Sequence, residues 1–194
     1  MISHNNRLLI TCILITIFIG GCVNPFHPNL RFNNDNQSNT NTPLIVLKNL
    51  ETAYCQRDIK LLKNILAPDF RFELVSSEVN LIGIDVNHDG IRDSWWGVDQ
   101  EIEFTDNLFN RGSSDGIYQS PEQIVLRLQI PPESQWVHDP DPAHEGWLII
   151  SCLFDLQLIY SPSSTITSNG SATFYLKQIN NRWYIAIWRD ESNI

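Results

Sequence analysis

The sequence predicts an α+β protein in which helices come first along the domain and an antiparallel sheet follows. Two patterns support this prediction. Apolar residues recur at helical spacing early in the domain, and toward its end they alternate with polar residues as in half-buried strands. The chain has 194 residues, enough for a short leader and one domain. Its formal net charge of −9 argues against nucleic-acid binding, which needs a basic face.

Three segments have the periodicity of helices. The first begins at Thr42-Pro43, an N-cap residue followed by proline at the first helical position. The second starts at Asp58 and is stopped by Pro68, because the residue before a proline is driven out of the helical region. The third covers residues 98–109, where apolar residues keep helical register.

Alternating segments predict the strands. They are residues 70–74, 124–130, 147–160, 171–179 and 182–190. The last two are joined by Asn180-Asn181, and both residues tolerate the positive φ of a two-residue hairpin turn. That hairpin register places Trp188 on one face and groups four apolar residues on the other, namely Phe174, Leu176, Ile185 and Ile187.

The first 22 residues have the pattern of a secretory signal. Arg7 precedes an apolar run over residues 8–19, which as a helix would span roughly 18 Å and could not cross a bilayer core of about 30 Å. The junction Ile19-Gly20-Gly21-Cys22 resembles the bacterial lipobox. The resemblance implies cleavage before Cys22, acylation of that residue, and a domain anchored in the bacterial cell envelope outside the cytoplasm. The alternative is an ordinary signal peptide with a cysteine near its cleavage site.

The chain therefore divides into a signal peptide at 1–21, the acylated cysteine with a flexible tether at 22–42, and a domain at 43–194. The tether contains seven Asn between residues 23 and 42 and has too few apolar residues to offset its ordering entropy. Because the domain is acidic, attachment to the membrane has to rest on the acyl chains. Cys55 and Cys152 are expected on different faces, which favours two buried thiols over a disulfide.

Three stretches share a pattern with one superfamily. They are Leu50-Glu51-Thr52-Ala53-Tyr54 running to Leu66-Ala67-Pro68-Asp69-Phe70, Ser94-Trp95-Trp96-Gly97 leading into Glu101, and Trp183-Tyr184-Ile185 followed by Trp188 and Asp190. Together they resemble the nuclear transport factor 2-like superfamily, which includes the SnoaL-like cyclases and ketosteroid isomerase. The resemblance implies a curved antiparallel sheet of about four to six strands, packed on three helices around a cone-shaped cavity.

Members of this superfamily use the cavity for catalysis, for ligand binding, or for neither, so the fold does not assign a reaction. Tyr54, Glu101, Trp188 and Asp190 are the candidate pocket residues, but their spacing matches no catalytic motif. We therefore expect a domain that binds a small hydrophobic ligand or a protein partner without catalysis. The alternative is a SnoaL-like enzyme acting on a hydrophobic small molecule.

One further motif has chemistry of its own. Residues 85–93 read Asp-x-Asn-x-Asp-Gly-x-x-Asp and resemble the calcium loops of EF-hands and dockerins. The expected ligands are the side chains of Asp85, Asn87, Asp89 and Asp93 and the carbonyl of Ile91. Trp96 stands where an EF-hand has its bidentate glutamate, so the loop is of a shorter type. Calcium is the one cofactor expected, and with it a calcium-dependent surface interaction; the alternative is an acidic turn before a helix.

Overall fold

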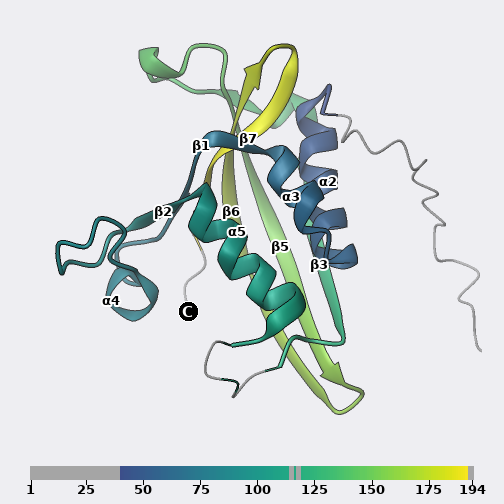
Figure 1. Ribbon diagram of the computed structural model, residues 1–194. Coiled ribbons are helices and arrows are strands. Elements are labelled where there is room, and N and C mark those ends of the chain that lie inside the picture. Colours follow the sequence, from purple (N-terminus) through teal and green to yellow (C-terminus); the bar gives the residue numbers. More distant parts are fainter. Residues whose placement is uncertain (1–39, 114–115, 117–118, 192–194) are drawn as a thin grey trace, which may run out of the picture. The chain divides into compact units, whose positions relative to one another are not determined.

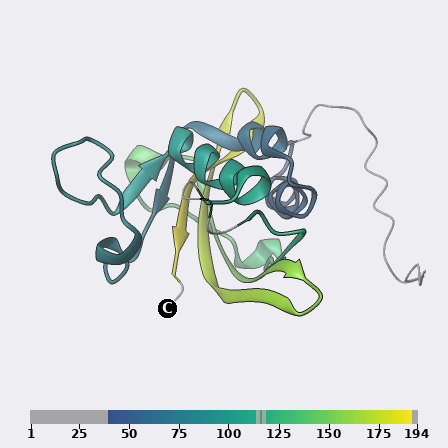
Figure 2. The same ribbon diagram turned by 60° about the horizontal axis from the view of Figure 1, so that its bottom comes forward.

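The computed structural model describes residues 40–113, 116 and 119–191. They belong to a compact unit that spans Gln37–Ile194. In this unit α2 (Pro43–Gln56), α3 (Ile59–Ile65) and α5 (Val98–Asp106) pack against one face of a curled sheet (Figures 1 and 2). Of the helices in the described ranges, none has the length and apolar character needed to span a membrane. The proposed lipidation site Cys22, the signal peptide and most of the tether lie outside the described residues.

Within the described residues the sheet has seven strands, and its main path runs in the order β2-β1-β7-β6-β5-β3, with β4 paired to β5. The strands are β1 (Leu66–Glu73), β2 (Trp95–Gly97), β3 (Gln123–Gln129), β4 (Val137–His138), β5 (Leu148–Ser161), β6 (Ser164–Ile179) and β7 (Arg182–Asp190). The α+β class is therefore confirmed. The sheet is mixed, however, since β1 and β7 are parallel while every other pair is antiparallel. Alternation of apolar and polar residues predicts where a strand lies. It does not predict whether that strand runs parallel or antiparallel to a partner strand more than 100 residues away.

The first two helices begin where their caps predict. The Thr42 hydroxyl accepts a hydrogen bond from the Ile45 amide, and the Asp58 carboxylate accepts from the amides of Lys60 and Leu61. The second helix ends earlier than predicted, because β1 begins at Leu66 and contains Pro68. The β1–β7 register is broken around Pro68, and an irregularity of this kind is where a strand tolerates proline.

Helix α5 continues as the π-helical segment η2 (Asn107–Arg111). The two segments together cover the predicted third helix. The structure also contains strand residues that the sequence did not predict. The two-residue strand β4 lies between the predicted strands of residues 124–130 and 147–160, and β6 begins at Ser164 instead of residue 171. The first six residues of β6 are exposed on both faces and, apart from Ile166, polar, so they show no alternation, and pairing with β5 makes them a strand.

The β6–β7 hairpin has the predicted turn, with both asparagines at positive φ, but a different register. A one-residue shift in β7 pairs Leu176 with Ile185 and then Phe174 with Trp188. The prediction that Ile187 shares the core face while Trp188 lies on the other was therefore wrong. An extra residue in one strand exchanges the faces of the residues beyond it, and here it turns Trp188 inward.

The core lies between the helices and the concave face of the sheet, with Phe70, Phe109 and Phe174 among its fully buried side chains. Cys152 belongs to this core, and both it and Cys55 are free thiols. The expectation of two buried thiols was wrong for Cys55, which is exposed. Cys55 lies on the flank of α2, and its sulfur contacts the backbone of β3, 3.6 Å from the Leu126 carbonyl oxygen.

Candidate functional site

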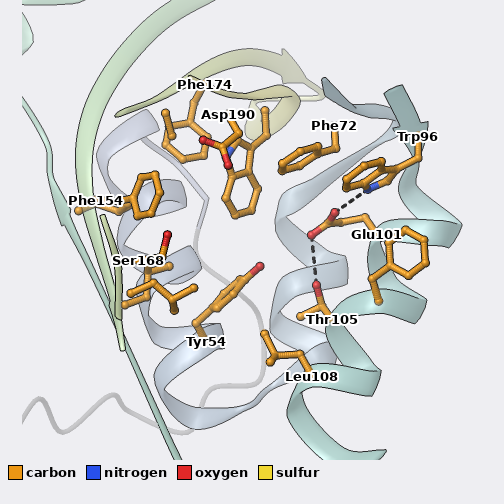
Figure 3. Close-up of a pocket in the computed structure, with 16 residues that line it drawn as sticks. Tyr54, Phe72, Trp96, Glu101, Thr105, Leu108, Phe154, Ser168, Phe174 and Asp190 are labelled. Carbon is orange, nitrogen blue, oxygen red and sulfur yellow. Dashed lines mark hydrogen bonds between the residues drawn. The ribbon is translucent and has the colours of Figure 1, made fainter. Parts of the chain in front are cut away.

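A cavity of about 270 Å³ lies between α2, α5 and the concave face of the sheet (Figure 3). Its lining is mainly apolar and includes Phe72, Leu126, Leu156, Ala172 and Phe174. The polar groups in the lining are few, and they are the side chains of Tyr54, Glu101, Thr105, Ser168 and Asp190. The structure thus brings the four candidate pocket residues, Tyr54, Glu101, Trp188 and Asp190, into the lining of one cavity.

Tyr54 reaches the cavity because it ends the buried apolar stripe of α2. Its ring packs edge-on against Phe109, with centroids 5.2 Å apart, and against Trp188 at 6.3 Å. Burial raises the pKa of the Tyr54 hydroxyl far above its ordinary value, and the charge of Glu101 raises it further. At neutral pH the hydroxyl is therefore a neutral hydrogen-bonding group, and in Figure 3 it points toward Glu101 and Thr105.

Glu101 is the buried acid of the cavity, with 4% of its surface exposed. It lies in the first turn of α5, directly after β2. Its Oε2 accepts a hydrogen bond from Trp96 Nε1 at 2.8 Å, and its Oε1 accepts from Thr105 Oγ1 at 3.1 Å. Burial raises the pKa of Glu101, and these two hydrogen bonds offset the rise in part. The carboxyl is held in place through both oxygens.

Asp190 enters the cavity from the end of β7 (Figure 3). Beside it is Glu78, the residue before the four-residue helix α4 (Val79–Ile82), which the sequence did not predict. Glu78 is only 3% exposed, and among the residues that the structure describes nothing donates a hydrogen bond to either of its carboxylate oxygens. Burial raises the pKa of Glu78, and the negative charge of Asp190 raises it further.

The expected calcium loop is placed as a closed turn outside the cavity. The carboxylate of Asp85 accepts hydrogen bonds from the amides of Asp89 at 3.0 Å and Gly90 at 2.8 Å, and Asp93 accepts from Val86 at 2.9 Å. Asp89 accepts from the Ile91 amide at 2.8 Å. In the described part of the chain, no three side chains of His, Cys, Asp or Glu form a group that could hold a metal ion. The calcium assignment stays a prediction.

Comparison with known proteins identifies similar folds and does not identify a family or a function. No family model and no curated protein matches the chain. Among solved structures, the Kfla4162 protein from Kribbella flavida aligns with a TM-score of 0.54 at 6% identity, over 78% of this chain and 88% of its own. A conserved protein from Planctomyces limnophilus aligns with a TM-score of 0.52 at 10% identity, over 75% and 88%.

A third solved structure comes from Novosphingobium aromaticivorans and is named as an aromatic ring hydroxylase. It aligns with a TM-score of 0.50 at 13% identity, over 77% of this chain and 85% of its own. Identities this low show a shared fold and leave function open. The α+β fold, with helices on the concave face of a curled sheet, is thus one that this chain shares with known bacterial proteins.

Proposed function

We propose that this protein is a lipid-anchored bacterial envelope protein whose domain binds a small, largely hydrophobic ligand without transforming it. The observation that carries the proposal is the apolar cavity of about 270 Å³ with a few convergent polar groups. Small-molecule sites commonly have this composition, in which apolar walls supply affinity and a few polar groups fix orientation.

The hydrogen bonds of the site suit it to binding. Both oxygens of Glu101 accept hydrogen bonds from the protein, from Trp96 and Thr105, and these hold the carboxyl group in one orientation. Each oxygen keeps a second lone pair, which can accept a hydrogen bond from a ligand. Glu101, together with the hydroxyl of Tyr54, is therefore suited to orienting a polar group of a bound molecule.

Ligand binding can be tested with the neutral apolar dye N-phenyl-1-naphthylamine, whose fluorescence rises in apolar surroundings. Ala172→Leu fills part of the cavity, so it should weaken dye binding while the melting temperature stays close to that of the wild type. The matched control is Ser171→Leu, since the neighbouring side chain of a strand points to the opposite face. Equal dye binding by both variants would place the dye elsewhere and contradict the proposal.

Anchoring is tested at Cys22. We expect radiolabelled palmitate to be incorporated into the wild-type protein and not into Cys22→Ala, because the lipobox resemblance makes this thiol the acceptor. The variant should leave the membrane fraction or keep its signal peptide. Unchanged lipid labelling of Cys22→Ala would refute the lipoprotein assignment.

A second candidate function is a SnoaL-like enzyme acting on a hydrophobic small molecule. The observation that favours it is the pair of Tyr54 and Glu101, both with raised pKa in one apolar cavity, because perturbed groups cluster at active sites. A molecule extracted from the purified protein should keep its mass through repeated binding if the domain only binds. Accumulation of a product, lost in Glu101→Gln, would establish the enzyme.

A further inference from the structure

We propose that the cavity selects a hydrophobic ligand whose polar group donates a hydrogen bond, an alcohol or a phenol, over one whose polar group only accepts, such as a ketone. Ionised Glu101 sets this preference through Thr105 and the hydroxyl of Tyr54. The inference rests on the proposed binding function and names the chemical class of the ligand. The observation that carries it is the direction of each hydrogen bond around Glu101.

Four side chains form a hydrogen-bond relay at the α5 side of the cavity. Trp96 Nε1 donates to Oε2 of Glu101 at 2.8 Å, and Thr105 Oγ1 lies 3.1 Å from Oε1 of the same carboxyl group. Glu101 and Thr105 stand one turn apart on α5, which puts their side chains on one face of the helix. Thr105 also shares a side-chain hydrogen bond with Tyr54, whose hydroxyl points toward it from α2 (Figure 3). All four side chains are buried and line the cavity.

An ionised Glu101 fixes the direction of every hydrogen bond in the relay. A carboxylate only accepts, an indole N–H only donates, and a hydroxyl has a single proton to give. The Thr105 proton is donated to Glu101, so the Tyr54 hydroxyl donates its own proton to Thr105. Tyr54 then offers only lone pairs to the cavity. A ligand hydroxyl can donate to these lone pairs, whereas the oxygen of a ketone meets acceptors alone.

Protonation of Glu101 reverses the relay. Its Oε2 accepts from Trp96, so the added proton lies on Oε1 and is donated to Thr105. Thr105 then donates to Tyr54, and the Tyr54 proton is left to point into the cavity. Both a ketone and an alcohol can accept that proton. The alcohol is therefore bound in both states and the ketone in one, so the preference for the alcohol should rise as Glu101 ionises.

The other groups of the cavity do not supply a competing donor. Among the described residues, no Lys, Arg or His lines the cavity, and its second acid, Asp190 of β7, adds acceptor oxygens. Ser168 is exposed on β6, where water competes for its hydroxyl. Burial raises the pKa of Glu101, so this carboxyl ionises at higher pH than an ordinary glutamate. Burial raises the pKa of Tyr54 so far that its hydroxyl stays neutral throughout.

The test is equilibrium dialysis of the full chain against two probes with one hydrocarbon body, 1-(2-naphthyl)ethanol and methyl 2-naphthyl ketone. At about pH 8.5 we expect the wild type to bind the alcohol about tenfold more tightly than the ketone, the usual worth of one hydrogen bond. The ratio should fall toward one at about pH 5, because the ketone gains affinity as Glu101 takes up its proton. Comparing ratios between proteins cancels the difference between the probes in water.

Glu101→Gln keeps the relay in its protonated arrangement, because the amide oxygen accepts from Trp96 and the amide nitrogen donates to Thr105. Its ratio should equal that of the wild type at low pH and should not change with pH. Glu103→Gln, an exposed acid on the same helix, is the matched control and should keep the profile of the wild type.

Thr105→Val breaks the relay and leaves the charge of Glu101 in place. The direction of the Tyr54 hydroxyl then no longer follows Glu101, so the ratio should lose its pH dependence. The matched control is Thr52→Val on α2, whose hydroxyl donates to the Lys48 carbonyl outside the cavity lining. This control should retain the pH dependence, which a merely structural role of Thr105 would also leave intact.

The outcomes separate the two proposals. If the ratio of the wild type does not change with pH, the inference is overturned and the hydrophobic binding function stands. If Glu101→Gln or Thr105→Val keeps the profile of the wild type, the relay is overturned. The alcohol binds in both arrangements, so its affinity reports an intact cavity in each variant, and if one variant loses both probes the other decides. Failure of both probes with the wild type would count against both proposals.

Discussion

The indole Nε1 of Trp96 donates a hydrogen bond to Oε2 of Glu101 at 2.8 Å, within the core and at the edge of the cavity. Trp96 belongs to β2 and Glu101 to the first turn of α5, so the hydrogen bond links the strand to the helix that directly follows it. The indole also stacks on Phe72 of β1, with ring centroids 4.4 Å apart. This one side chain therefore joins the outer strands to the acid of the cavity.

The first prediction removes that donor. Trp96→Phe keeps a ring against Phe72 but leaves Oε2 of Glu101 without its hydrogen bond, so the free energy of unfolding should fall by about 2–3 kcal/mol. Urea denaturation at pH 7 measures the loss. The control is Trp95→Phe, whose partly exposed ring lies under Arg71 and should cost less than about 1 kcal/mol. Equal losses would show that ring volume matters and the hydrogen bond does not.

The second prediction concerns pH and Glu101. Because burial raises its pKa in the folded state, folded protein holds this proton to higher pH than unfolded protein does. Stability therefore falls as pH rises from the unfolded pKa to the folded one, by up to about 1.4 kcal/mol per pH unit. Glu101→Gln removes this slope and still offers an acceptor to Trp96. Urea unfolding from pH 4.5 to 8.5 should show a flatter profile, and an unchanged profile would argue that the carboxyl titrates normally.

The third prediction separates the two thiols of the domain. Burial raises the pKa of Cys152 to about 12, and the charge of Glu51 contributes to this rise, whereas Cys55 is exposed. Iodoacetamide at pH 8 should therefore modify Cys55 in the folded protein and reach Cys152 only after unfolding. Peptide mass mapping assigns each site. Modification of Cys152 at native conditions, at the rate of Cys55, would contradict its burial.

The fourth prediction tests the loop of residues 85–93. If its oxygens hold calcium with a dissociation constant of roughly 10⁻⁴–10⁻³ M, calcium at about 1 mM should stabilise the fold by about 0.4–1.4 kcal/mol relative to chelator. Asp89→Ala should abolish this gain, and Glu122→Ala, an exposed acid outside the loop, should keep it. A melting temperature indifferent to calcium in the wild type and both variants would leave the acidic turn as the explanation.

Local signals in the sequence determined the helices, the hairpin turn and the α+β class. Thr42 and Asp58 cap their helices through atoms two or three residues away, and an interaction of that range can be read from the chain directly. The residue types also pointed to Tyr54, Glu101, Trp188 and Asp190, because the superfamily resemblance implies a cavity and these are the types of residue that such a cavity would use.

Only the tertiary structure decided the direction of β1 beside β7, the inward turn of Trp188 and the meeting of Glu78 with Asp190. Each depends on pairing between segments more than ten residues apart, and a shift of one residue exchanges the faces of a strand. Periodicity reports which side of a segment is apolar, whereas the partner strand decides what that side faces. A buried acid such as Glu78 leaves no trace in the pattern, since the long-range contacts that bury it are also what raise its pKa.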